Sequence, residues 1–281
     1  MQIKANAKIN LALDVLGKRD DGYHEVSMIM QEVSLCDIID IEKTNGNSIE
    51  LIVKKSPLPC DENNIAYKAA KLFYHKSGLV PSCSITLEKH IPVCAGLGGG
   101  SSDAAAVLKG LNNLYDKVFT DKELCEMSVS LGADVPFFIQ GKTAHASGIG
   151  EKLACIPSCF DLWLVLIKPD IDISTAEAYR EIDNASFPHL DMPRLIEGAK
   201  RGDITVFREH SGNSFEYVSV NKYPVINHIK NHFQNSGALF SMMSGSGPTV
   251  FGVFDSEQKA KQAFESYNGS FQGGGVCRFV K

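Results

Sequence analysis

The chain has 281 residues, of which 44% are hydrophobic, so it is long enough for two domains with a substantial core, and this composition argues against intrinsic disorder. The formal net charge of -5 comes from charges of both signs without a basic run, which argues against nucleic acid or an anionic membrane as a partner. The eight cysteines have no zinc-binding spacing, and the first residues lack the apolar core of a signal peptide. We therefore expect a cytoplasmic protein that acts on a small molecule.

The first predicted element is a half-buried strand over residues 3–15, because its odd positions are apolar and most even positions are polar. The two-residue period of a strand places Lys8 and Asn10 on the same polar face, where both side chains could point into a cleft. An Asp-Gly turn at residues 21–22 follows this strand.

The residues up to 153 then alternate strand and helix patterns around one glycine-rich loop. Strands are predicted over 38–42, 48–54 and 83–87, and a hairpin is predicted over 137–153. One helix opens near Asn63 and Asn64, and a second follows the loop with Ser102 or Asp103 as its N-cap. A third helix begins with the capping box of Thr120 and Glu123 and ends at Gly132. Asp134 falls in the loop after the last of these helices.

The second half again mixes helices and strands. This half follows a proline-containing boundary at 156–161. Its predicted strands cover 162–167, which is buried, and 238–242, 249–254 and 276–280. Its predicted helices cover 175–181, 193–200, 224–233 and 257–267. This mixed order indicates an α+β fold rather than a doubly wound sheet. We expect an N-terminal domain over 1–156 and a C-terminal domain over 157–281.

The segment PVCAGLGGGSSDA, residues 92–104, is typical of a loop that binds phosphate. Its glycines at 96, 98, 99 and 100 allow backbone N–H groups to turn inward, and the helix that follows adds a partial positive charge. No lysine follows the last glycine, as a Walker A loop requires, and Ser101 occupies the third glycine position of a GxGxxG motif. The loop therefore belongs to another class, although a tightly turning loop without a ligand also fits the glycines.

A second glycine motif, SGSGPTVFG at residues 244–252, lies between two predicted strands. It is interpreted either as a strand-connecting turn or as a backbone that packs against a ligand or the first loop.

Three segments together resemble the GHMP kinases: AKINLALDV at residues 7–15, the glycine-rich loop at 92–104, and the motif at 244–252. The resemblance implies a two-domain α+β GHMP kinase fold with the active site in the cleft between the domains, and ATP as phosphate donor. Within this family, GKRDDGYHEV at 17–26 and LGADVPFF at 131–138 are similar to members that phosphorylate the 2-hydroxyl of a cytidyl diphosphate polyol in non-mevalonate isoprenoid synthesis.

The resemblance implies catalytic roles for Asp134 and Lys8. A carboxylate at Asp134 would accept the proton of the attacking hydroxyl, and the Lys8 ammonium would keep that carboxylate charged and offset charge on the transferring phosphoryl group. Taken singly, each residue also has an ordinary structural explanation, as an aspartate after a helix and as a solvated lysine on a strand.

The resemblance also implies a set of ATP contacts that centre on the glycine-rich loop. These are Pro92, Val93, Cys94, Ala95, Gly96, Leu97, Gly98, Gly99, Gly100, Ser101, Ser102 and Asp103, with Asn64 and Lys89 on the adenosine side. A helix cap at Asn64 and a surface strand lysine at Lys89 explain the last two as well. Magnesium is expected to accompany ATP, and the sequence does not indicate its protein ligands.

The resemblance places the second substrate among polar and aromatic residues from both halves of the chain. These are Asn10 for the polyol, Tyr23 and His24 for the cytosine, Tyr179 as an aromatic that stacks on that ring, and Thr175 in the same pocket. For Tyr23, His24 and Tyr179 the alternatives are a turn aromatic, a surface histidine and a core tyrosine.

Two further functions are compatible with these motifs: a GHMP kinase of the homoserine or mevalonate type, and a non-catalytic nucleotide-binding sensor with the same fold. The DGYH and GADVPFF segments argue against the first, and the presence of both Lys8 and Asp134 argues against the second. The expected assembly is a monomer or a weak homodimer.

Overall fold

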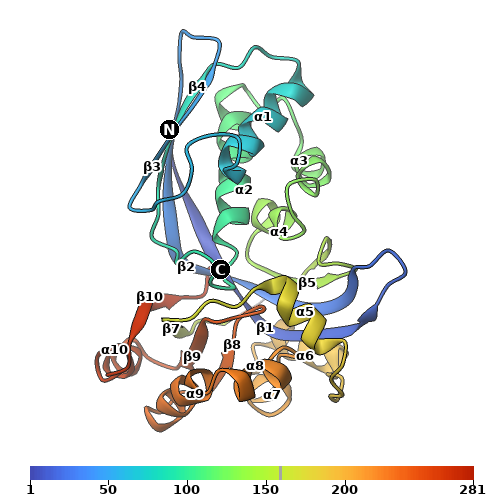
Figure 1. The fold of residues 1–281 in the computed structure, drawn as a ribbon, viewed down its shortest axis with the longest axis vertical. Helices are drawn as coiled ribbons and strands as arrows, with labels where there is room; N and C mark the ends of the chain where they lie inside the picture. The colour runs from blue at the N-terminus through green and yellow to red at the C-terminus, as the bar shows by residue number, and fades with distance from the viewer. Residues whose placement is uncertain (158–159) are drawn as a thin grey trace. The chain divides into compact units, whose positions relative to one another are not determined.

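The structure, a computed structural model, describes residues 1–157 and 160–281 (Figure 1). The predicted boundary at 156–161 falls partly outside the described residues, as does Cys159, and the seven described cysteines are free thiols. None of the described helices is both long and apolar enough to span a bilayer.

The described chain forms two compact units. The first unit comprises Met1–Ala7, Cys36–Ile91 and Gly98–Gly141, and the second comprises Lys8–Leu35, Pro92–Leu97 and Lys142–Lys281. Two long strands, β1 (Gln2–Lys18) and β2 (His24–Lys43), contribute residues to both. The predicted domains, 1–156 and 157–281, divide the chain differently, along the sequence, and stay a prediction.

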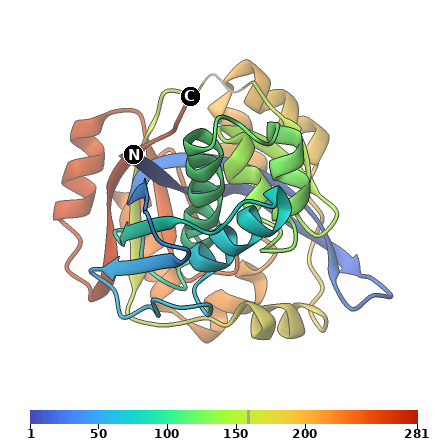
Figure 2. The ribbon, with the colours of Figure 1, turned by 90° about the horizontal axis from the view of Figure 1, so that it is seen from above.

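The first unit packs helices against a small sheet. Residues 38–43 of β2 pair antiparallel with β4 (Cys83–Glu88), which pairs in parallel with β3 (Ile49–Lys54). The helices are α1 (Ile65–Ser77), α2 (Gly99–Leu114), α3 (Asp121–Ser128) and α4 (Val135–Gln140). Figure 2 shows α1 and α2 side by side, and the two helices are in contact. At Gly110 of α2 an added Cβ would lie 2.5 Å from Ile3 Cδ1, so only glycine allows this helix to approach β1 so closely.

The second unit contains a hairpin and a separate antiparallel sheet. Residues 28–31 of β2 pair with β5 (Thr143–Ser147), which pairs with β6 (Lys152–Cys155). The separate sheet has the order β10-β7-β9-β8 and consists of β7 (Trp163–Pro169), β8 (Phe240–Met243), β9 (Val250–Phe254) and β10 (Phe271–Arg278). Residues 164–167 of β7 are fully buried, as the continuous apolar run predicts.

Helices cover this sheet and connect its strands. α9 (Val225–Asn235) and α10 (Glu257–Glu265) pack on the sheet, and α5 (Thr175–Ile182), α6 (Met192–Arg201), α7 (Ile204–His210) and α8 (Glu216–Lys222) lie between β7 and α9 in the chain. The sequence analysis did not predict α7 and α8, since each has only 7 residues and too few turns for a helical period to emerge.

The predicted burial of β1 is wrong in detail. The strand predicted as half-buried is buried on both faces from Ala7 to Val15, including Lys8, Asn10 and Asp14. Backbone from elsewhere in the second unit also pairs with the strand, because Lys8 N donates to Leu97 O and Leu13 N donates to Gly212 O.

The helices near the glycine-rich loop also differ from their predicted bounds. α2 begins at Gly99 with Gly98 as its N-cap, so Ser102 and Asp103 lie inside the helix, where Ser102 Oγ donates to Asn6 O and Asp103 pairs with Lys89. The capping box of Thr120 and Glu123 is confirmed, but α3 ends at Ser128, before Gly132. Residues 135–140 form α4, so the predicted hairpin over 137–153 is shorter and comprises β5 and β6.

Candidate active site

The glycine-rich loop ends in a helix that can bind an anion. Gly98 O accepts the first helical hydrogen bond, from Ser102 N at 2.9 Å, so the N–H groups of Gly99, Gly100 and Ser101 precede that bond and have no acceptor within α2. α2 has 16 residues, and its macrodipole adds a partial positive charge at these donors. The first turn of α2 therefore offers backbone donors suited to a phosphate group.

The preceding part of the loop, residues 92–97, packs against the second glycine motif in the second unit. Ser244 Oγ donates to Gly96 O at 3.0 Å, and Gly96 has a φ of 74°. A Cβ added at Gly96 would lie 2.2 Å from Ser244 O, so no side chain fits there. The segment after Ser244 thus connects β8 to β9 and also supports the loop, as one of the two interpretations of this motif predicted.

The second glycine motif is itself held by a residue that the sequence analysis missed. Asn213 is buried, and its Nδ2 donates to Met243 O and to Gly245 O, both at 2.8 Å. No local pattern marks Asn213, because its partners lie about 30 residues further along the chain.

Lys8 and Asn10 share one face of β1, which confirms the prediction from the strand period. Lys8 Nζ donates to Asn10 Oδ1 at 2.7 Å, and both side chains are buried. The backbone N–H of Lys8 also donates to Leu97 O at 3.0 Å, so this part of β1 lies against the loop. A buried ammonium in a part of β1 that lies against the loop is a group suited to an anionic ligand.

Asp134 lies at the start of α4 in the first unit. It is half-buried and occupies the N-cap position, but its carboxylate does not cap the helix. Pro136 lies in the first turn of α4 and removes one of the N–H groups that a cap would satisfy. Capping α4 is therefore not the explanation for an aspartate at this position.

His24 and Tyr179, from β2 and α5, meet in the second unit. Their rings stack with centroids 4.5 Å apart and an interplanar angle of 26°, and the Phe215 ring meets Tyr179 edge-on at 4.9 Å. A cavity of about 460 Å³ lies beside His24. Of the other predicted substrate residues, Tyr23 is 59% exposed, and Thr175 Oγ1 lies 2.8 Å from Ser246 Oγ of the second glycine motif.

Asp183 orients His24, and the sequence analysis did not predict it. Asp183 Oδ1 lies 2.5 Å from His24 Nε2, and Asp183 Oδ2 accepts from Lys18 Nζ at 2.9 Å. These hydrogen bonds, from His24 first and then Lys18, hold the pKa of Asp183 below its ordinary value. An aspartate at the end of an exposed helix carries no local signal for such a role.

Asn64 and Lys89 have structural partners in the first unit. Asn64 Oδ1 caps α1 by accepting from Ala66 N at 2.9 Å, and Asn64 Nδ2 donates to Pro59 O at 2.8 Å. Lys89 is 7% exposed and pairs with Asp37 and Asp103. The alternative of a surface lysine at this position is therefore wrong, and the cap at Asn64 is confirmed.

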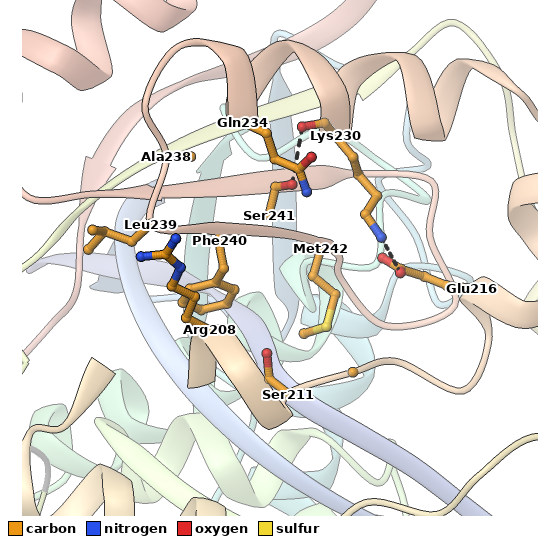
Figure 3. Close-up of a pocket in the computed structure, with 11 residues that line it drawn as sticks. Arg208, Ser211, Glu216, Lys230, Gln234, Ala238, Leu239, Phe240, Ser241 and Met242 are labelled. Carbon is orange, nitrogen blue, oxygen red and sulfur yellow. Dashed lines mark hydrogen bonds and ion pairs between the residues drawn. The ribbon is translucent and has the colours of Figure 1, made fainter. Parts of the chain in front are cut away.

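A second cavity, of about 420 Å³, lies between α7, α9 and β8 and contains none of the predicted site residues (Figure 3). Lys230 pairs with Glu216 on its wall, and the other carboxylate oxygen of Glu216 accepts from Met243 N at 2.6 Å. These polar groups hold β8 in place, next to the second glycine motif. Among the described residues, no group of three or more His, Cys, Asp or Glu side chains is placed to hold a metal ion.

Comparison with known proteins identifies the family. Residues 64–142 match the GHMP kinases N terminal domain, and residues 195–272 match the GHMP kinases C terminal domain. The chain is 45% identical over 269 residues to the 4-diphosphocytidyl-2-C-methyl-D-erythritol kinase of Alkaliphilus metalliredigens (strain QYMF), covering 95% of this chain and 92% of that protein. The chain belongs to the GHMP kinases.

Within the GHMP kinases, the full-length similarity is to one group. The 4-diphosphocytidyl-2-C-methyl-D-erythritol kinase of Clostridium beijerinckii (strain ATCC 51743 / NCIMB 8052) is 43% identical over 281 residues and covers 100% of both chains. A crystal structure of 4-(cytidine 5'-diphospho)-2C-methyl-D-erythritol kinase is 32% identical, has a TM-score of 0.84 and covers 99% of both chains. The predicted family, α+β GHMP fold and kinase class are confirmed.

Proposed function

We propose that this GHMP kinase transfers the γ-phosphoryl group of ATP to the 2-hydroxyl of 4-diphosphocytidyl-2-C-methyl-D-erythritol. The products are ADP and the 2-phosphate, an intermediate of the non-mevalonate route to isoprenoid precursors. The observation that carries the proposal is the similarity over 95% of the chain to a kinase named for this substrate. The DGYH turn and the GADVPFF segment support the same substrate.

The glycine-rich loop, residues 92–103, binds the phosphates of ATP in this proposal. Support comes from the backbone donors of Gly99, Gly100 and Ser101 at the start of α2, and from the second glycine motif that packs on Gly96. Asn64 is the proposed contact on the adenosine side, whereas Lys89, which is buried between Asp37 and Asp103, is proposed to act on the loop from within the first unit. Magnesium bound with ATP would neutralise phosphate charge, and its ligands are not assigned to residues of this chain.

Asp134 and Lys8 carry the chemistry in this proposal. Asp134 accepts the proton of the attacking 2-hydroxyl, and Lys8 stabilises charge on the transferring phosphoryl group. The burial of Lys8 supports its role, because a buried ammonium interacts strongly with an anion. In this proposal Asn10 orients that ammonium and holds the polyol, and the hydrogen bond that Asn10 Oδ1 accepts from Lys8 Nζ supports the first of these roles.

The cytosine of the substrate binds near His24, with Tyr23 and Tyr179 as aromatic partners and Thr175 in the same pocket. The cavity beside His24 supports this placement. His24 already covers one face of the Tyr179 ring and Phe215 meets that ring edge-on, while the Tyr23 ring is exposed and gives the base a further aromatic surface.

The experiment that tests the proposed function is an ATP-consumption assay across several alcohols: diphosphocytidyl-methylerythritol, homoserine and mevalonate. Turnover is expected with the first alone. Turnover with homoserine or mevalonate would overturn the substrate assignment, and ATP binding without turnover on any alcohol would favour a sensor.

The variant Asp134→Asn tests the assigned base. We expect kcat to fall by about 10²–10⁴-fold, because the amide cannot accept the proton, while ATP binds as before through the loop. Single-turnover assays and ATP titration measure the two effects, with Asp121→Asn in α3 as the control for loss of one carboxylate. Near-normal turnover of Asp134→Asn would refute its role.

A further inference from the structure

Three charged residues form a cluster beneath the first turn of α2, and we call Asp37, Lys89 and Asp103 the buried triad. Their side chains are only 0%, 5% and 2% exposed, respectively. Lys89 Nζ contacts a carboxylate oxygen of Asp37, and it lies 2.7 Å from Asp103 Oδ2. The lysine thus joins β2 to α2 through charge-assisted hydrogen bonds that water does not reach.

One proton makes this cluster neutral. Burial alone would lower the pKa of Lys89, but Asp103 and Asp37 outweigh that effect and raise it, so the lysine is charged. Burial, with the nearby Asp37 charge, raises the pKa of Asp103 to about 8 against the opposing effect of Lys89. Asp103 Oδ1 has no hydrogen-bond partner among the described residues, whereas both carboxylate oxygens of Asp37 accept hydrogen bonds, so Asp103 is the carboxylate that takes the proton more readily.

The buried triad holds the chain at both ends of the glycine-rich loop. Asp37 Oδ1 accepts from His90 N at 2.5 Å and from Ile91 N at 2.8 Å, immediately before the loop. Asp103 lies at the other end, in the second turn of α2. Lys89 connects the two carboxylates, so one ammonium ties residues 90–91 to α2.

The ammonium also lies against the first residue of α2. A Cβ added at Gly99 would lie 3.4 Å from Lys89 Nζ and 3.0 Å from Ile91 Cγ2. The positive charge of Lys89 is therefore next to the backbone donors that precede the first helical hydrogen bond. A glycine-rich segment loses much conformational entropy when it becomes ordered. Because Lys89 already orders part of the loop in the free protein, less of this entropy is lost when the ligand binds.

We propose that the buried triad is a positioning device for the phosphate-binding loop. Lys89 and Asp37 hold residues 90–91 and Asp103 at a constant spacing, so the N–H groups at the start of α2 are ordered before the nucleotide arrives. Lys89 acts through α2 and not by contact with the nucleotide. This inference rests on the proposed function, because the loop must bind the phosphates of ATP.

The test is Asp103→Ala, which cuts the tie to α2 but leaves Lys89 paired with Asp37, so that no buried charge loses its only partner. We expect the KM for ATP to rise about tenfold and the KM for the alcohol to stay within about twofold. Asp103→Asn keeps an oxygen that accepts from Lys89, and it is expected to restore the KM for ATP to within about twofold of the original value.

The matched control is Lys55→Met, because Lys55 forms an exposed ion pair with Glu88 in the same unit, with a side chain that is 59% exposed. It is expected to change neither KM, since exposed ion pairs contribute little. Where Asp103→Ala does not fold, Asp103→Ser, whose hydroxyl is too short to reach Lys89, carries the same expectation.

Three outcomes would overturn the inference: an unchanged KM for ATP in Asp103→Ala, an equal rise of both KM values, or no rescue by Asp103→Asn. An unchanged KM in Asp103→Ala together with a raised KM in Lys89→Met would indicate direct contact of Lys89 with the nucleotide. Failure of the original chain to bind ATP would instead refute the proposed function, so the two failures are distinguishable.

Discussion

At the scale of single residues, the base site depends on one aromatic pair. Tyr179 lies between His24, which stacks on it, and Phe215, which meets it edge-on. Removal of the Tyr179 ring therefore takes away a surface for the cytosine and also the packing that holds the His24 imidazole.

We expect Tyr179→Ala to raise the KM for the cytidyl substrate by about tenfold and to leave the KM for ATP within about twofold, because one aromatic stacking contact contributes roughly 0.5–1.5 kcal/mol beyond its buried area. Steady-state kinetics with each substrate varied in turn measures both values. Tyr217→Ala, which removes an exposed tyrosine stacked on Phe187, is the control for loss of a ring. An equal change in both KM values for Tyr179→Ala would contradict the proposed stacking of the cytosine on Tyr179.

Asp103 predicts an unusual pH dependence of stability. Its pKa is about 8 in the folded chain and has an ordinary value of 3.8, so between these pH values the folded state keeps a proton that the unfolded state releases. The free energy of unfolding therefore falls as pH rises through this window, by roughly 1 kcal/mol per pH unit at most, and is constant again above it. Asp103→Asn has no such proton.

Denaturant unfolding at pH 5.5, 6.5, 7.5 and 8.5, compared between the original chain and Asp103→Asn, isolates this effect. Carboxylates with lowered pKa values, such as Asp161 and Glu177, lose their contribution as pH falls and act below this range. The difference in free energy of unfolding between the original chain and Asp103→Asn is expected to narrow or change sign as pH rises from 5.5 to 8.5. Parallel curves would contradict the proton on Asp103.

At the scale of elements, the two glycine motifs support each other. Gly96 combines a φ of 74° with a backbone oxygen, Ser244 O, 2.2 Å from the position of an added Cβ. Gly100, in the first turn of α2, has neither constraint, since an added Cβ would have only an ordinary contact of 3.5 Å with Ile65. The same substitution at these two positions therefore tests whether the contact between the motifs is required.

Gly96→Ala is expected to destabilise the chain by about 2 kcal/mol or more and to weaken ATP binding, because the loop must move away from Ser244. Gly100→Ala is expected to keep or slightly raise stability, by about 0.5–1 kcal/mol, since alanine favours the helix. Thermal unfolding and ATP titration measure both. Equal destabilisation by the two variants would contradict the steric argument.

At the scale of the whole molecule, a kinase that binds ATP must be stabilised by ATP. At a free ATP concentration of 100 Kd the folded state gains about 2.7 kcal/mol, which raises the unfolding midpoint by roughly 5–10 °C for a chain of this size. Asp134→Asn is expected to keep the whole shift, since the loop and not the carboxylate holds the phosphates. A midpoint that ATP does not move would refute the assigned nucleotide.

Local patterns of the sequence determined much of this protein. The two-residue period placed Lys8 beside Asn10, helix-start chemistry identified Asn64 and the Thr120–Glu123 box, and the motifs indicated the family. These features depend on dihedral angles and neighbours within a few residues, so spacing along the chain is sufficient to reveal them.

Only the tertiary structure decided which distant groups meet. Partners far away in the sequence decide the burial of Lys89 and the pairing of His24 with Asp183. Asp37, for example, is 52 residues from Lys89. The local pattern also did not show that α2 starts at Gly99. Lys89 directly follows β4, and the alternation along that strand does not show what covers the residue after it. Burial and long-range hydrogen bonds arise when elements pack, and local spacing carries no information about them.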